Sequence, residues 1–150
     1  MRTVLVILGV CALMVGSAWP IGASDFRDVC ECIDRAERAS QAGDHQTALA
    51  ILNGLEARHT ESYAVRMLWL TRGAVYSRIG DHSQALASFE RFIAMAPGVA
   101  LAHHNRGVVL LALGRAREAL EAFQIAQRLR DDPEVQAGIT AARSRLAETR

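Results

Sequence analysis

The sequence predicts an all-α solenoid, in which helix–turn–helix units stack side by side. The composition is 51% apolar and only 5% aromatic, which suits packed helices and is too apolar for a disordered chain. A ten-residue segment that begins at Gly80 returns at Gly114, and an earlier copy begins at Gly43. The interval of 34 residues between the second and third copies is typical of stacked helical repeats. These observations favour three repeated units over an irregular bundle.

The N-terminal segment is expected to lie outside this fold, as a secretory signal peptide over residues 1–23. Arg2 precedes an apolar run, and small residues follow that run, an order typical of such peptides. We expect cleavage after Ala23, with Ala18 as the second choice. The alternative is an uncleaved inner-membrane anchor through residues 4–23, because about 20 apolar residues suffice to span a bilayer.

The remaining chain, residues 24–150, is predicted to form three units and a cap. Each unit is two helices joined at a glycine, because Gly43, Gly80 and Gly114 can adopt the left-handed conformation that ends a helix. The units cover about residues 29–62, 66–99 and 100–133, and a more polar capping helix follows over residues 134–149.

The residues that follow these glycines indicate where the second helix of each unit begins. Asp44 and Asp81 can cap those helices by accepting hydrogen bonds from backbone N–H groups of the first turn. Arg115 stands at the equivalent place in the third unit and offers no acceptor, so we expect a weaker helix start there. Pro133 suits the first turn of the last helix.

The middle unit resembles a tetratricopeptide repeat. Its residues Trp69-x-x-Arg72-Gly73-x-x-Tyr76, then Gly80, Ala85-x-x-x-Phe89 and Pro97, follow the pattern of that family except at Arg72, where leucine is usual. The third unit keeps several of these residues, namely Gly107, Gly114, Ala119 and Phe123, with His103 in place of the tryptophan. The first unit is degenerate.

The small residues of this pattern predict close helix packing within a unit. We expect the two helices of a unit to cross closely at four positions, which are Gly73, Ala85, Gly107 and Ala119. Phe89 and Phe123 are expected to fill the space between neighbouring units.

The resemblance implies a concave groove, lined by the first helix of each unit, that receives a peptide or a partner helix. The implied lining is largely apolar, which suits an amphipathic helix or an extended apolar segment. The first unit contributes Cys30, Ile33, Asp34 and Glu37; the second Met67, Leu70, Thr71, Ala74 and Arg78; the third Leu101, His104, Asn105, Val108 and Leu111.

One known variant of the family is not expected here. It clamps a C-terminal carboxylate with a cluster of lysine, asparagine and arginine. Ile33 and Glu37 stand where that variant carries lysine and asparagine, and the chain contains no lysine at all. We therefore expect no recognition of chaperone C-terminal tails.

No catalytic or metal-binding motif appears in the sequence. The absence of lysine excludes Walker-type phosphate loops and Schiff-base chemistry. His103 and His104 are adjacent, and neighbouring helical residues diverge by about 100°, so we expect His103 to pack between helices and His104 to face the groove. We predict no catalytic residue, no metal site and no cofactor, and a formal charge of +1 gives no indication of nucleic-acid binding.

Cys30 and Cys32 are the two cysteines that remain after signal-peptide cleavage. Helical residues two apart point to different sides, so we expect one to pack as a small apolar side chain and the other to be partly exposed. An intermolecular or strained disulfide is the alternative.

The sequence thus predicts an exported protein, periplasmic or secreted, that acts as a non-catalytic interaction module. Its partner is expected to be a protein or peptide of the cell envelope. A homodimer is one alternative, and a membrane-tethered subunit that retains residues 1–23 is the other.

Overall fold

The computed structural model describes residues 23–58 and 62–148, with side chains described for residues 27–56 and 65–148. This part of the chain forms only helices. Their bounds are α2 Ala23–Gln41, α3 His45–Arg58, α4 Ser62–Ile79, α5 His82–Met95, α6 Ala100–Ala112, α7 Ala116–Leu129 and α8 Pro133–Glu148. The predicted signal peptide falls almost entirely outside the described residues. None of the described helices has the length and apolar character needed to cross a membrane.

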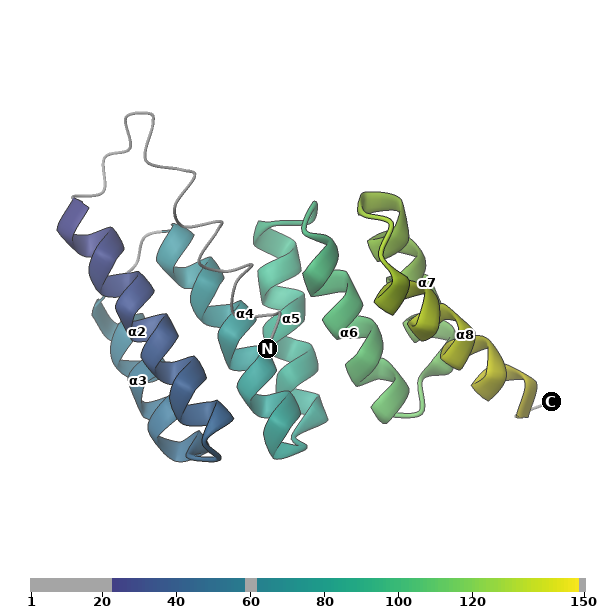
Figure 1. Cartoon of the computed structure of the whole chain (residues 1–150), viewed down its shortest axis with the longest axis horizontal. Coiled ribbons are helices and arrows are strands. Elements are labelled where there is room, and N and C mark those ends of the chain that lie inside the picture. The colour runs from purple at the N-terminus through teal and green to yellow at the C-terminus, as the bar shows by residue number, and fades with distance from the viewer. Residues whose placement is uncertain (1–22, 59–61, 149–150) are drawn as a thin grey trace.

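The helices stack as successive antiparallel pairs (Figure 1). The pairs are α2 with α3, α4 with α5, and α6 with α7, and α8 packs against α7 and α6 at the C-terminal end. Helices α2, α4 and α6 form one layer, while α3, α5 and α7 form a second layer behind it (Figure 1). The described part of the chain is therefore the predicted all-α solenoid of three helix–turn–helix units with a capping helix.

The turns within the three units follow the sequence prediction. Gly43, Gly80 and Gly114 have φ angles of 86°, 87° and 74°, in the region that side-chain-bearing residues avoid. The Asp44 carboxylate accepts a hydrogen bond from the Thr47 backbone N–H at 3.0 Å, and hydrogen bonds from the Thr47 side chain and backbone lower the Asp44 pKa.

The helix starts of the second and third units differ in the predicted way. Asp81 accepts a hydrogen bond from the Gln84 backbone N–H at 3.1 Å. Arg115 makes no side-chain capping bond and instead pairs with Glu118 at 2.6 Å. This ion pair lowers the pKa of the Glu118 carboxyl. Pro133 is the first residue of α8.

Two phenylalanine rings hold the second half of the solenoid together. Phe89 and Phe123 are buried in a cluster contributed mainly by α5 to α8. A Cβ atom at Gly73 would lie 2.6 Å from the Phe89 ring, so only glycine leaves room for this contact between α4 and α5. A Cβ atom at Gly107 of α6 or at Gly138 of α8 would lie 2.8 Å or 2.5 Å from the Phe123 ring, so this ring also packs against the capping helix. The contact with Gly138 was not predicted.

Arg72 links the first unit to the second. Its side chain occupies the position where the repeat pattern has leucine, and the residue is only 6% exposed. Its Nη2 donates to the Asn53 Oδ1 at 2.7 Å and to the Glu56 Oε2 at 2.8 Å, both on α3. Its guanidinium carbon lies 4.7 Å from the centroid of the Trp69 ring, within cation–π range. A polar contact thus joins α3 to α4.

Candidate functional site

The layer formed by α2, α4 and α6 brings equivalent positions of the three units into rows. Residue 37 of the first unit corresponds to residue 74 of the second and residue 108 of the third, because the copies are offset by 37 and 34 residues. One row is therefore Glu37, Ala74 and Val108. The neighbouring row consists of Asp34, Thr71 and Asn105.

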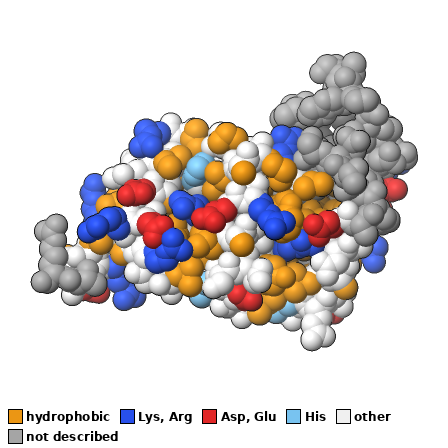
Figure 2. Space-filling model, turned by 180° about the vertical axis from the view of Figure 1, so that it is seen from behind, with side chains coloured by type: hydrophobic (Ala, Val, Ile, Leu, Met, Phe, Trp, Pro, Cys, Tyr) orange, Lys and Arg blue, Asp and Glu red, His pale blue; other side chains and the backbone are white. Residues whose placement is uncertain are grey.

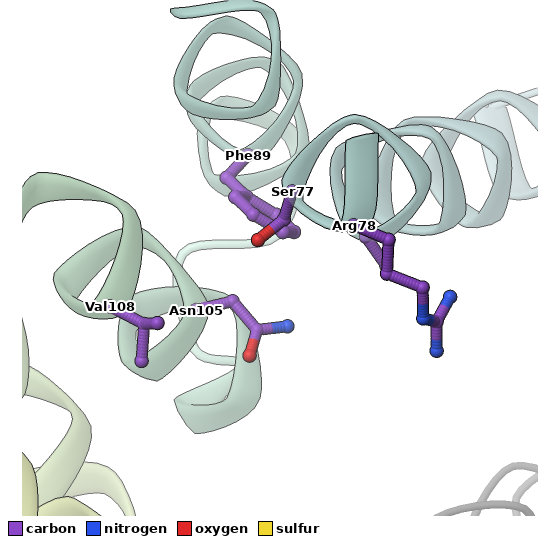
Figure 3. A pocket seen from close by; sticks show the side chains of 6 residues that line it. Ser77, Arg78, Phe89, Asn105 and Val108 are labelled. Atoms are coloured by element: carbon purple, nitrogen blue, oxygen red, sulfur yellow. The ribbon is translucent and has the colours of Figure 1, made fainter. Parts of the chain in front are cut away.

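A pocket of about 200 Å³ opens between α4 and α6. Its lining comprises Ala74, Ser77, Arg78, Phe89, Asn105 and Val108. Figure 3 shows the Phe89 ring of α5 reaching toward the gap between α4 and α6, and the Arg78 side chain extending away from α6. The pocket therefore has an aromatic and aliphatic interior with polar groups from both first helices at its edge.

Arg78 connects the pocket to the first unit. Its Nη1 donates to the Ser40 Oγ of α2 at 3.3 Å, and this hydroxyl also lies 3.3 Å from the His45 Nδ1. The exposed guanidinium therefore lies between the pocket and the helix that carries Asp34 and Glu37.

Asp34 and Glu37 place two carboxylates at the first-unit end of the groove. They are three residues apart on α2, and both are half-buried. Burial raises the pKa of the Glu37 carboxyl, the charge of Asp34 raises it further, and the charge of Arg78 partly opposes the rise. Desolvation therefore outweighs the attraction of the nearby cation.

The structure places the predicted groove residues in two groups. Four of them, Ala74, Arg78, Asn105 and Val108, line the pocket. Val108 and Leu101 are 44% and 41% exposed, so the third unit presents open apolar surface.

The second group faces the interior. Thr71 is only 3% exposed, and Ile33 is buried in a second apolar cluster, which α2, α3 and α4 contribute. Met67, Leu70 and Leu111 are partly buried against the two clusters. Sequence reasoning did not place Ser77 or Phe89 in the groove, although the expectation that Phe89 fills the gap between units pointed to this region.

Two of the histidines and one of the cysteines contact neighbouring helices or turns within the stack. His103 is buried as predicted, with its Nε2 2.8 Å from the Pro97 carbonyl oxygen. His104 lies edge-on against Phe123, with ring centroids 5.6 Å apart. Cys30 and Cys32 are both half-buried, and Cys32 packs against the apolar cluster of α2, α3 and α4. Across the described ranges, no group of three or more histidine, cysteine, aspartate or glutamate residues has the arrangement of a metal site.

The opposite face of the solenoid has a different character. Figure 2 shows basic and acidic side chains interspersed with apolar ones on this face, without a large area of a single sign. Such a mixed surface is typical of solvated helices. It offers less to a specific partner than the pocket does.

Comparison with known proteins places the fold. A family model described as tetratricopeptide repeat matches residues 70–134. The chain is 34% identical over 80 residues to protein FlbA of Caulobacter vibrioides, which covers 53% of this chain and 13% of that protein. It is 32% identical over 89 residues to superkiller complex protein 3 of Mus musculus, which covers 59% of this chain and 6% of that protein. The chain therefore spans a small part of these relatives.

Solved structures show the same architecture. The first repeat domain of the human RPAP3 protein superposes with a TM-score of 0.72 at 18% identity, covering 80% of this chain and 93% of that one. The first repeat domain of Spaghetti, bound to the HSP90 peptide SRMEEVD, gives 0.71 at 17% identity, covering 81% and 94%. At such low sequence identities, the structural similarity establishes the fold alone.

Proposed function

We propose that this chain, a solenoid of tetratricopeptide repeats, binds a peptide or helix of a cell-envelope partner in the groove of α2, α4 and α6, as a scaffold or assembly factor. The observation that carries the proposal is the pocket between α4 and α6, next to the open side chains of Leu101 and Val108. Exposed apolar surface with polar groups at its edge marks interaction sites in soluble domains.

The family supports a binding role without catalysis. Tetratricopeptide repeat proteins are generally non-catalytic interaction modules, and a structural neighbour is bound to a chaperone peptide. The groove side chains of this chain bind by shape and by charge. We therefore propose that the protein acts by holding its partner.

Export completes the proposal. The basic, apolar and small-residue regions of the first 23 residues are typical of a signal peptide and support a location in the periplasm or outside the cell. N-terminal sequencing of the protein from its native host tests this. A mature start at Ser24 supports export with cleavage, whereas retention of Met1 or Arg2 would replace it with a membrane-tethered protein.

Site-specific photocrosslinking in the native host tests the groove. The full chain, tagged at its C-terminus, would carry a photoreactive amino acid at Val108, and in a matched control at Leu129 of α7. Leu129 is 43% exposed, so the two positions are equally accessible and differ in the layer to which they belong. We expect an envelope protein to crosslink from position 108 and not from position 129.

The pattern of adducts decides between the alternatives. An adduct with twice the mass of the chain from position 108 would support the homodimer in place of a separate partner. Equal adducts from both positions, or adducts only from position 129, would refute the groove as the binding surface.

A further inference from the structure

The chemistry of the groove changes from one unit to the next. The row of Glu37, Ala74 and Val108 passes from a carboxylate to a methyl group and then to a branched aliphatic side chain. The neighbouring row begins with Asp34, continues with the buried Thr71 and ends with Asn105. The groove is thus acidic at its first unit and uncharged at its third.

Two arginines lie near the acidic end without forming an ion pair with it: Arg78 acts on Glu37, and the Arg38 Nε donates to the Asp34 backbone carbonyl oxygen at 3.3 Å. In the part of the chain that the structure describes, the salt bridges involve other carboxylates, such as Glu56, Glu90 and Glu118, and neither Asp34 nor Glu37 takes part in one. Arg78 lies near enough to act on Glu37, but its Nη1 hydrogen-bonds to Ser40. Burial raises the pKa of the Glu37 carboxyl despite this arginine. A half-buried carboxylate in this position would be stabilised by a second positive charge.

The third-unit end offers a complementary apolar site. The predicted groove positions of α6 carry no carboxylate and no guanidinium, because Arg106 turns toward Glu90 on α5. The pocket beside them is lined by Ala74, Val108 and the Phe89 ring. Its volume of about 200 Å³ accommodates a branched aliphatic side chain.

We propose that the groove binds an extended partner segment that places an arginine or lysine against Asp34 and Glu37 and an aliphatic side chain in the pocket between α4 and α6. This inference rests on the proposed function and names the chemistry of the partner. A segment with acidic residues is disfavoured, because like charges would meet at α2 without compensation.

The spacing of the two anchors follows from the packing of the helices. Neighbouring packed helices lie about 8–10 Å apart, and the pocket lies one to one and a half such steps beyond Glu37. An extended chain advances about 3.3 Å per residue. The basic and the aliphatic residue of the partner should therefore be three to five positions apart.

Selection from a displayed library of random twelve-residue peptides tests this inference. The immobilised full chain would be compared with a variant that carries Asp34→Asn and Glu37→Gln, which keeps the size of both side chains and removes their charges. We expect the wild type to enrich peptides with an arginine or lysine three to five positions from a leucine, isoleucine or valine. The variant should lose the basic preference and keep the aliphatic one.

Binding measurements on the enriched peptides quantify the effect. By fluorescence anisotropy we expect the variant to bind about tenfold more weakly, which corresponds to about 1.4 kcal/mol, and circular dichroism should show an unchanged helical fold. The difference should shrink as salt is added, since exposed ion pairs are screened.

The possible failures are distinguishable. Enrichment of peptides without basic residues, or equal affinity of both proteins for basic peptides, would overturn the inference and leave groove binding intact. No enrichment with either protein would overturn the proposed function together with the inference.

Discussion

Replacing Gly138 by alanine tests how closely the capping helix α8 packs against Phe123. Gly138 lies on α8 against the ring of Phe123, which is fully buried among α6, α7 and α8. A Cβ atom at this position would lie 2.5 Å from the ring Cε1 and under 3.0 Å from two more ring atoms. The same ring edge also packs closely against Gly107 of α6, where a Cβ atom would lie 2.8 Å from it, so the ring has little room to move toward that helix.

Two opposing effects set the magnitude. Alanine stabilises a helix by up to about 1 kcal/mol relative to glycine, whereas overpacking a buried site costs about 1–3 kcal/mol. We therefore expect Gly138→Ala to lower the free energy of unfolding by up to about 2 kcal/mol. The matched control is Gly54→Ala on α3, where a Cβ atom would meet nothing within 4 Å. This control should stabilise the protein by about 0.5–1 kcal/mol.

Urea unfolding followed by circular dichroism measures both variants against the wild type. Gly138→Ala should lower the free energy of unfolding less in a Phe123→Leu background than in the wild type, because the smaller side chain leaves room for the methyl group. The two changes should therefore couple. If Gly138→Ala stabilises the protein as much as Gly54→Ala does, the seating of α8 on Phe123 is refuted.

Three further predictions concern the N-terminal cap of α5, the buried arginine and the acidic end of the groove. Asp81→Ala should lower the free energy of unfolding by about 1 kcal/mol in urea titrations, because it removes the bond to the Gln84 N–H, while Arg115→Ala, at the equivalent place without a capping bond, should cost less. Glu56→Ala should cost about 1–3 kcal/mol by the same titration, because it removes a charged hydrogen bond from the buried guanidinium of Arg72; a loss no larger than that of Glu90→Ala at the exposed pair would refute this role. Since the Glu37 pKa is raised in the folded protein, the folded state binds the proton more tightly, and stability should fall as pH rises from about 4.5 through the raised pKa. Glu37→Gln should flatten this part of the pH profile, measured by thermal unfolding at a series of pH values, and an unchanged profile would contradict the assignment.

The features that depend on short stretches of sequence could be predicted, because their causes are local. The turn glycines and the Asp44 and Asp81 caps act within a few residues, and the repeat places the glycines in all three units and the aspartates in the first two. The bond from Arg72 to Asn53 and Glu56 joins residues 19 and 16 positions apart. The repeat pattern does not predict these hydrogen bonds, because it shows only that an arginine stands where leucine is usual.

The groove could be predicted only in outline. The family resemblance implies which side of a helix faces the concave layer, and three of the positions that it implies, Ala74, Arg78 and Val108, line one pocket. It does not give the angle at which neighbouring helices cross, and that angle decides whether a side chain at the border of the groove-facing side of a helix is exposed or buried. Thr71, which the resemblance places in the groove, is only 3% exposed.

The acidic end of the groove is where the fold and the proposed function place opposite demands on one residue. An alanine or valine at position 37 would match Ala74 and Val108 of the same row. It would bury apolar area without a desolvation cost. Glu37 instead carries a half-buried charge whose pKa is raised by burial, so its ionised form destabilises the folded state at neutral pH. Departures of this kind from local consistency concentrate at functional sites. A cation supplied by a bound partner would convert that cost into binding free energy, because the complex would add a second positive charge to that of Arg78.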